Sequence, residues 1–321
     1  MSPEEKLGII RQNTVEIVNE EELKALLESG KKPTVYCGYE VSGEVHLGHM
    51  VTTTKLLDFL KAGCRVKVLF ADWHTYLNRK AEWDEINKLT KMWNGAFIAL
   101  GLGQAEFVIG SHIQRNADYI DDVMKIAAKT TINRALRSMQ AVARDIENAR
   151  VSQVIYPFMQ IVDMKYLGVD IASSGIEQRK IHMLGREILG DLGYKSPVML
   201  HTPLIPSLQG PGEKMSSSKP ETMISVRDQE NIVTKKINKA YCPEGDAKDN
   251  PVMAIAQLII FPRIEQFTIE RPGEYGGNMF FKDYKCLEQA FADKLLHPAD
   301  LKKAVAKYLN GILEPIRKQM A

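Results

Sequence analysis

Cysteine is scarce in this sequence of 321 residues, and its few copies are isolated. No C-x-x-C pair occurs among them, so the sequence predicts neither a disulfide framework nor a zinc ribbon. Long apolar runs are also missing: the best one, Val252 to Phe261, is far shorter than the roughly 20 residues that a membrane-spanning helix needs. The charged first residues lack the apolar core of a signal peptide. We therefore expect a reduced, cytoplasmic enzyme with no membrane segment.

An excess of charge of one sign is absent as well. The 42 Lys and Arg residues nearly balance the 40 Asp and Glu residues, which leaves a net charge of +2. A polyanion would therefore have to be bound by local patches rather than by the field of the whole molecule. A content of 45% hydrophobic and 26% charged residues is that of a soluble globular protein and argues against disorder. At roughly 150 residues per domain, the length predicts about two domains.

Strand-like and helix-like segments alternate from Thr34 onward. Alternation of this kind predicts an α/β fold, here a Rossmann-like parallel sheet with covering helices, which binds ligands beyond the carboxyl ends of its strands. The expected strands are 34–39, 66–71, 105–110, 169–173 and 198–201, and the clearest helices are 47–62 and 82–100.

Two segments depart from this alternation. Helix follows helix between about 116 and 167, which indicates a helical insertion into the α/β domain. After the Pro-, Gly- and Ser-rich stretch 203–220 and one short strand at 222–226, the sequence turns mainly helical. We expect a catalytic domain over 1–226 and a mainly α-helical domain over 227–321.

The first motif is His46-Leu47-Gly48-His49, which follows a predicted strand and opens a helix. Backbone N–H groups and the positive end of a helix favour phosphate there, and Gly48 lets a flat ring approach the backbone. The imidazoles of His46 and His49 can donate hydrogen bonds to phosphate oxygens that gain charge during attack on phosphorus. A helix-capping His beside a surface His, or a zinc-binding pair, would give the same spacing.

The second motif lies in the loop expected over 210–220. Its sequence GPGEKMSSSKP combines glycines and prolines with two lysines and three hydroxyl groups. A mobile loop that brings Lys214 onto a leaving pyrophosphate would have this composition, because phosphoryl chemistry depends on positioning and charge. A flexible linker with solvated lysines would look similar.

Together the two motifs resemble the signatures of class I aminoacyl-tRNA synthetases. Three further segments resemble the archaeal/eukaryotic type of tyrosyl-tRNA synthetase: 36–43 (YCGYEVSG), 154–160 (VIYPFMQ) and 177–183 (EQRKIHM). This resemblance implies activation of L-tyrosine with ATP and Mg²⁺ to tyrosyl-adenylate and pyrophosphate, then transfer of the tyrosyl group to the 3′ end of tRNA(Tyr). It also implies a homodimer, a C-terminal domain that binds the anticodon, and no metal ligands on the protein.

The resemblance assigns the ATP chemistry to particular positions. His46, His49 and Lys214 are the expected catalytic residues. The expected ATP-binding positions also include the signature loop and several residues near the strand ends: Gly38, Gly48, Glu177, Met215, Ser216, Ser217 and Ser218. Ser217 stands where many class I enzymes have a second Lys, and we expect Lys219 to replace part of that charge.

The amino acid is predicted from a polar stripe in an apolar segment. Tyr156, Gln160 and Asp163 lie at i, i+4 and i+7, so on a helix they share one face. That face is either the solvent-exposed face of an amphipathic helix or a ligand-binding surface. Asp163 and Tyr36 supply the acceptor and the donor that a phenolic hydroxyl requires, at positions that the resemblance assigns to it. The resemblance places the α-amino group at Tyr156, Gln160 and Gln178.

Two regions are candidates for contact with RNA. Arg134, Arg137 and Arg144 share one helix face that could follow the phosphates of the acceptor end, although a solvated face would look the same. The segment 301–321 carries five basic residues against one acidic residue. Upstream of it, positions that the resemblance links to the first anticodon base could stack on it and bond its edge: Tyr275, His297 and Asp300. A helix N-cap at Asp300 is the alternative.

Three rival functions remain open at this point. A tryptophanyl enzyme of the same class would need an acceptor for the indole N–H and no donor at that end of the pocket. The pairing of Tyr36 with Asp163 therefore argues against this function. A nucleotidylyltransferase that uses the H-x-G-H turn on a small alcohol or a mononucleotide, without RNA, would not need the last ninety or so residues. A non-catalytic RNA-binding relative would not need His46, His49 and Lys214.

Overall fold

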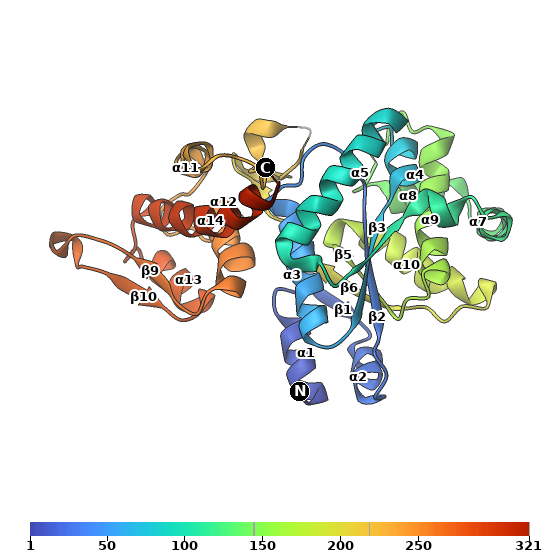
Figure 1. The fold of residues 1–321 in the computed structure, drawn as a ribbon, viewed down its shortest axis with the longest axis horizontal. Helices are drawn as coiled ribbons and strands as arrows, with labels where there is room; N and C mark the ends of the chain where they lie inside the picture. Colours follow the sequence, from blue (N-terminus) through green and yellow to red (C-terminus); the bar gives the residue numbers. More distant parts are fainter. Residues whose placement is uncertain (144, 218, 321) are drawn as a thin grey trace. The chain divides into compact units, whose positions relative to one another are not determined.

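A six-stranded sheet forms the centre of the α/β part of the computed structural model, which describes residues 1–143, 145–217 and 219–320 (Figure 1). Its strands lie in the order β1-β6-β5-β2-β3-β4. Their bounds are Glu16–Val18 (β1), Val198–Thr202 (β6), Ile171–Gly175 (β5), Thr34–Tyr39 (β2), Arg65–Phe70 (β3) and Glu106–Ile109 (β4). The predicted α/β fold is confirmed, and each predicted strand of the alternating region lies within two residues of an observed one.

The sheet is parallel except at one edge. Strands β6, β5, β2, β3 and β4 all run in one direction, whereas β1 pairs antiparallel with β6 and makes the sheet mixed. The strand order reverses between β2 and β5, since β3 and β4 follow β2 on one side and β6 follows β5 on the other. Ligands of such sheets bind outside the carboxyl ends of the strands at this reversal. The end of β2 and the end of β5 are therefore where side chains can meet a substrate.

The helices connect these strands and form the chain's two ends. Helix α3 (Leu47–Lys61) begins inside the H-x-G-H motif, directly after His46, and ends before Gly63, whose positive φ of 86° stops it. The helices are α1 (Pro3–Arg11), α2 (Glu20–Glu28), α3 (Leu47–Lys61), α4 (Asp72–Leu77), α5 (Trp83–Phe97), α6 (Gly110–Gln114), α7 (Ala117–Lys129), α8 (Ile132–Met139), α9 (Val151–Tyr166), α10 (Arg179–Ile188), α11 (Glu230–Lys239), α12 (Pro251–Ile255), α13 (Tyr284–Ala292) and α14 (Pro298–Met320). The predicted helical insertion is thus α7, α8 and α9.

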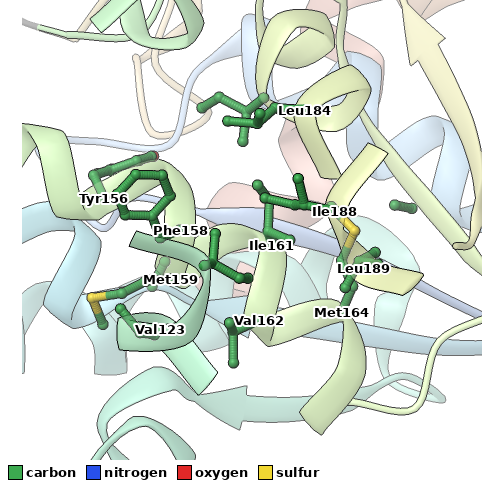
Figure 2. Packing of buried hydrophobic residues seen from close by; sticks show 14 of the residues in the cluster. Val123, Tyr156, Phe158, Met159, Ile161, Val162, Met164, Leu184, Ile188 and Leu189 are labelled. Atoms are coloured by element: carbon green, nitrogen blue, oxygen red, sulfur yellow. The ribbon is translucent and has the colours of Figure 1, made fainter. Parts of the chain in front are cut away.

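The largest part of the core around the insertion comes from α9. Its apolar residues belong to one buried cluster with residues of α7 and α10; Figure 2 labels Val123 of α7, Phe158 and Ile161 of α9, and Leu184 of α10. Gly185 on α10 keeps the two helices close, because a Cβ there would stand 3.3 Å from Ile161. Burial of these apolar side chains, at about 25 cal/mol per Å² of apolar surface, stabilises the packed position of α9. The packing of α9 thereby positions its polar residues.

Two predictions about the segment after β6 are wrong. Residues 222–226 do not form a strand: Thr222 ends a 3-10 turn, and only Ser225 makes an isolated antiparallel bridge, with His46. The expected loop over 210–220 begins as a strand, β8 (Gly210–Lys214), which forms a hairpin with β7 (Pro206–Ser207). A second hairpin, β9 (Phe267–Ile269) with β10 (Met279–Phe281), lies within the helical C-terminal part.

The described chain divides into two compact units. Unit 1 comprises Met1–Ser42, Lys55–Asn94 and Gly101–Pro203, and it contains the whole six-stranded sheet. Unit 2 comprises Gly43–Thr54, Gly95–Leu100 and Leu204–Ala321, so the H-x-G-H turn and the K-M-S-S-S segment belong to the same unit. None of the described helices is both long and apolar enough to cross a membrane.

Candidate active site

The polar stripe of α9 lies inside the protein. Tyr156 and Asp163 are buried, with 4% and 0% of their surface exposed, and Gln160 is partly buried. The interpretation of this face as the wet side of an amphipathic helix is therefore wrong. Buried polar groups are costly unless they find partners, so the partners of these side chains indicate what the face does.

Asp163 is bonded through only one of its two carboxyl oxygens. Oδ1 accepts hydrogen bonds from Gln114 Nε2 (2.8 Å) and from the hydroxyl of Tyr119 (2.9 Å). Oδ2 is fully buried and has no hydrogen-bond partner among the described residues; His74 Nε2, which also has none there, lies 3.6 Å away. An acceptor left open in this way fits a hydroxyl donor that comes from a ligand.

The protonation states around Asp163 follow from burial. Desolvation raises the pKa of Asp163 to about 7 and lowers the pKa of His74 to about 3, so the imidazole is neutral and the 3.6 Å approach is not an ion pair. Burial, and then the nearby charge of Asp163, raise the pKa of Tyr36 well above its ordinary value. The Tyr36 hydroxyl on β2 therefore keeps its proton. The site therefore combines an open acceptor oxygen, Asp163 Oδ2, with the phenolic donor of Tyr36.

Exchange of Asp163 for asparagine should stabilise the protein at alkaline pH. The folded-state pKa of about 7 lies above the unfolded value of about 3.9, so ionisation disfavours the folded state, and stability falls as the pH rises between these values. A carboxamide at this position does not ionise and carries no such penalty. We expect Asp163→Asn to gain about 2–4 kcal/mol at pH 8 and almost nothing at pH 4, measured by urea unfolding. An equal difference at both pH values would contradict the buried, ionisable carboxyl.

The other expected tyrosine ligands lie at the carboxyl end of β5 and on α9. Gln160 Nε2 donates to Gln178 Oε1 over 3.3 Å, and Gln160 Oε1 is buried without a hydrogen-bond partner in the described part of the chain. Gln178 ends the 3-10 turn Ile176–Gln178 that follows β5. A Cβ on Gly175, just before this turn, would stand 2.2 Å from Glu177 Oε2, so a larger residue there would displace the Glu177 carboxyl group. The structure thus brings together Gln160, Gln178 and Glu177 at the point where the strand order reverses.

The H-x-G-H turn is closed by its own imidazoles. His46 Nδ1 accepts from the Gly48 N–H (3.0 Å), and His49 Nδ1 accepts from the His46 N–H (3.1 Å). The two rings lie 3.9 Å apart between centroids. A Cβ on Gly48 would stand 2.7 Å from the His46 ring, so glycine is required there. The helix-capping interpretation is correct for His46, while His49 is half-buried rather than a surface residue.

These hydrogen bonds also define which ring nitrogen carries the proton. Burial, and then the charge of Lys214, lower the pKa of His46 to about 3, so its imidazole is neutral. Because Nδ1 accepts in a neutral ring, Nε2 carries the proton and is the donor. The same reasoning gives His49 an Nε2 donor when it is neutral. Among the described residues, no three His, Cys, Asp or Glu side chains are grouped to hold a metal ion, so the zinc alternative lacks further ligands there.

The second motif is attached to the first. The Val226 N–H donates to Val45 O (3.0 Å) and the Leu47 N–H donates to Ile224 O (3.1 Å), which ties the segment after the K-M-S-S-S sequence to the turn. Gly43, at a φ of 62°, lies so close to Ser217 that a Cβ would stand 2.8 Å from its Cβ. The two motifs therefore occupy one region of unit 2.

Within the K-M-S-S-S segment, the side chains differ in their surroundings. Met215 is buried and its N–H donates to Ile205 O (3.1 Å), whereas Lys214 at the end of β8 is exposed. Ser216 and Ser217 are half-buried, and Ser218 lies outside the described residues. Lys219 bonds both carboxyl oxygens of Glu213, each at 2.7 Å.

Comparisons with known proteins agree with this geometry. A family model described as tRNA synthetases class I (W and Y) matches residues 28–314. The tyrosine–tRNA ligase of Archaeoglobus fulgidus is 51% identical over 318 residues, 98% of each chain, and that of Methanosarcina barkeri is 48% identical over 316 residues, 98% of this chain and 99% of the relative. The crystal structure of the Archaeoglobus fulgidus tyrosyl-tRNA synthetase complexed with L-tyrosine matches with a TM-score of 0.96 and 50% identity over all of both chains. The chain belongs to the tyrosyl-tRNA synthetases.

The expected RNA-binding arginines of this synthetase lie on α8. Arg134 forms an ion pair with Glu187, and Arg137 is exposed with its Nε bonded to Asn133 O at 3.3 Å. The two residues are three positions apart on α8, about one helical turn. Arg144, the third residue of the predicted basic face, lies outside the described residues.

The expected anticodon-binding residues of the synthetase occupy two neighbouring segments of unit 2. Arg271 joins them, because its Nε donates to Gly277 O (3.1 Å) and its Nη1 to Leu295 O (3.0 Å). Tyr275 is 66% exposed, and His297 is exposed with Nδ1 accepting from the Ala299 N–H. Asp300 lies inside the first turn of α14 and not at its N-cap, so the capping alternative for Asp300 is wrong.

Several residues around Asp163 escaped sequence reasoning in this synthetase. His74 lies on α4 after β3, and Gln114 ends α6 after β4, so both follow the carboxyl ends of parallel strands. That position is a signal which could have identified them. Tyr119 lies on α7 in an amphipathic pattern where an aromatic residue indicates ordinary packing, so no signal in the sequence identifies it as a partner of Asp163.

Proposed function

We propose that the chain is a tyrosine–tRNA ligase. It activates L-tyrosine with ATP to tyrosyl-adenylate and pyrophosphate, and it then transfers the tyrosyl group to the 3′ end of tRNA(Tyr). The observation that carries this proposal is the buried Asp163 Oδ2, which has no hydrogen-bond partner among the described residues. The Tyr36 hydroxyl, which keeps its proton, is within reach of the Asp163 charge. The chain that holds these two groups is about half identical to tyrosine–tRNA ligases. A buried acceptor together with a buried donor suits a phenol and not an indole or a benzyl group.

In the first step, the carboxylate of tyrosine attacks the α-phosphate of ATP. Mg²⁺ enters with the nucleotide as Mg–ATP, where it neutralises phosphate charge. His46 and His49 direct Nε2 donors at the phosphates, and Lys214 supplies a cation to the leaving pyrophosphate. Gly38, Gly48 and the K-M-S-S-S segment line the nucleotide, and Glu177 binds its ribose. Catalysis then rests on positioned donors and charge rather than on a side-chain nucleophile.

Tyrosine is bound at both of its ends. Tyr36 donates a hydrogen bond to the phenolic oxygen of the substrate, and Asp163 accepts a hydrogen bond from the phenolic O–H of the substrate. At the other end, Tyr156, Gln160 and Gln178 hold the α-amino group. The buried Gln160 Oε1, which has no protein partner, is a suitable acceptor for an ammonium N–H.

The second step needs contacts with RNA. Arg134 and Arg137 bind phosphates of the acceptor end, while Tyr275, His297 and Asp300 bind the first anticodon base by stacking and edge hydrogen bonds. We divide these tasks between a catalytic domain over 1–226 and an anticodon-binding domain over 227–321. The enzyme works as a homodimer in the cytoplasm; exposed apolar side chains on the insertion support the dimer, namely Ile120, Met124, Ile132 and Val151.

Amino-acid-dependent pyrophosphate exchange tests the proposal. With ATP and labelled pyrophosphate, tyrosine alone among tyrosine, phenylalanine and tryptophan should give exchange. Exchange with tryptophan would indicate the tryptophanyl enzyme. Exchange that needs no amino acid would indicate a nucleotidylyltransferase, and no exchange at all would indicate a non-catalytic RNA-binding protein.

Removal of the Lys219 ammonium should slow adenylate formation. Lys219 is held by Glu213 on β8, close to Lys214, so it adds positive charge to a segment that carries Ser217 in place of a second lysine. We expect Lys219→Ala to lower kcat of pyrophosphate exchange by about threefold to tenfold, as befits an exposed, partly screened charge. Lys307→Ala, which breaks a similar exposed pair with Glu270, is the control. An unchanged exchange rate in Lys219→Ala would exclude this role.

Substitution of the two exposed rings in the anticodon region should affect tRNA alone. In the double variant Tyr275→Leu and His297→Leu, the stacking surface is lost, and stacking on an aromatic ring is worth about 1–3 kcal/mol per base. We expect the KM for tRNA in aminoacylation to rise about tenfold or more, with tyrosine-dependent exchange unchanged. Loss of both activities would indicate a folding defect, and unchanged aminoacylation would place base recognition elsewhere.

A further inference from the structure

Two buried histidines of unit 1 have no part in the chemistry described so far. His182 on α10 has 1% of its surface exposed, and His201 on β6 has 0%. His182 Nδ1 lies 3.1 Å from His201 Nε2, and His201 Nδ1 lies 3.0 Å from Glu16 Oε2. A pair of buried imidazoles linked to a carboxylate requires a reason, because burying polar groups is favourable only in a satisfied network.

The fold itself brings these side chains together. Glu16 on β1 stands directly opposite His201 in the antiparallel pairing with β6, so their side chains project from the same face. Arg179, the first residue of α10, donates from Nε and Nη2 to the two carboxyl oxygens of Glu16, at 2.7 and 2.8 Å. His182 lies three residues further along α10, on the same side of the helix. The hydrogen bonds therefore close a ring through Glu16, Arg179, the first turn of α10, His182 and His201.

One arrangement of protons satisfies this ring. Arg179 holds the pKa of Glu16 below its ordinary value, so Glu16 is a carboxylate and accepts from His201 Nδ1–H. Burial lowers the pKa of His201 and lowers that of His182 to about 3, so both rings are neutral. His201 Nε2 is then an acceptor, and His182 Nδ1 is the donor to it. Every hydrogen bond in the ring has a defined direction.

We infer that Glu16, His201 and His182 are positioning residues that hold Gln178 in place for the α-amino group of tyrosine. Gln178 directly precedes Arg179 and lies four residues before His182, so the ring fixes the helical turn on which it stands. Gln178 meets Gln160 on α9 at 3.3 Å, a contact that a small rotation of α10 would break. This inference rests on the proposed function, because it takes Gln178 as a ligand of the amino group. The inference goes beyond the proposed function because it gives a positioning role to residues that do not contact the substrate.

A pair of ligands that differ only in the amino group tests this inference. Isothermal calorimetry on the full-length protein would measure the Kd of L-tyrosine and of 3-(4-hydroxyphenyl)propionate, which lacks that group. In His182→Leu, we expect the Kd of tyrosine to rise about tenfold, while the Kd of the propionate stays within about twofold. His182→Asn places an N–H where Nδ1 stands, so it should return the Kd of tyrosine to within about threefold of the unaltered protein.

A matched control comes from the other end of the same helix. Arg186 ties α10 to Glu22 on α2 and to Pro197 O, so Arg186→Leu loosens the helix without touching the ring. It should lower the melting temperature and leave the ratio of the two Kd values unchanged. If His182→Leu does not fold, Glu16→Gln carries the test, because its carboxamide no longer holds Arg179 and His201 as a carboxylate does.

Three outcomes would overturn the inference: an unchanged ratio in the ring variants, equal weakening of both ligands, or the same change in Arg186→Leu. Failure of the proposed function is distinguishable from all of them, because then the unaltered protein would not bind tyrosine.

Discussion

Replacing Asp163 by alanine is expected to remove most of the preference for tyrosine over phenylalanine. In the unaltered enzyme, bound phenylalanine would leave the buried Oδ2 of Asp163 and the Tyr36 hydroxyl without hydrogen-bond partners. The free-energy cost of these unsatisfied buried groups disfavours the binding of phenylalanine. Asp163→Ala abolishes the stranded acceptor, so phenylalanine loses its penalty while tyrosine loses its hydrogen bond. We expect the ratio of kcat/KM for the two amino acids in pyrophosphate exchange to fall about 100-fold or more.

The scale of this discrimination is set by the family. Tyrosyl-tRNA synthetases are themselves the standard example of such rejection, at about 10⁵-fold, so that figure belongs to the family and is no consequence of this structure. Tyr119→Phe is the matched control, because it removes one donor to Oδ1 and leaves the carboxyl group in place. Its ratio should change much less. Retained discrimination in Asp163→Ala would place the recognition of the hydroxyl group elsewhere.

Removing the imidazole of His46 should slow tyrosyl-adenylate formation by about 10²- to 10³-fold. This is the usual effect of deleting one donor aimed at charge that develops in a transition state. Because the Gly48 N–H is bonded to Nδ1, the donor lost in His46→Ala is Nε2–H. Single-turnover formation of the adenylate from tyrosine and Mg–ATP measures the effect, and the KM for tyrosine should change little.

Two isosteric variants separate catalysis from helix capping. The shorter carboxamide of His46→Asn would offer an oxygen to the Gly48 N–H but no donor at the position of Nε2. The longer carboxamide of His46→Gln would offer an N–H near Nε2 without the cap. We therefore expect His46→Asn to be stable and nearly as slow as His46→Ala, and His46→Gln to be less stable and faster. A His46→Asn enzyme with the unaltered rate would show that this imidazole only caps α3.

The parts of the fold that the sequence predicts well are those with local causes. The β-branched and aromatic run 34–39 is β2, and the apolar spacing of 47–62 with Gly63 after it is α3. Segment 222–226 fails because Ile224 and Val226 resemble a strand, yet their backbone groups bond to the turn at 45–47, where the described residues form an isolated bridge and no ladder. Strand β8 escaped prediction because glycine and proline usually indicate a loop, and its pairing with β7 depends on a hairpin register that composition does not encode.

The candidate site divides in the same way. Tyr156, Gln160 and Asp163 could be found because helical spacing places three polar residues on one face of an apolar segment. Gln114 and Tyr119 could not, because their bonds to Asp163 span 49 and 44 residues and leave no periodic trace. The ring through Glu16 and His201 spans still more of the chain and depends on the antiparallel register of β1, a strand that the alternating pattern does not include.

The placement of β1 also bears on how the sheet avoids aggregation. β1 has three residues and β4 has four, and these two strands form the edges of the six-stranded sheet. A short edge offers few unpaired N–H and C=O groups as a template for a foreign strand. The longer, mostly buried strands β2 and β5, which position the candidate substrate residues, are thereby kept from intermolecular pairing in the folded state.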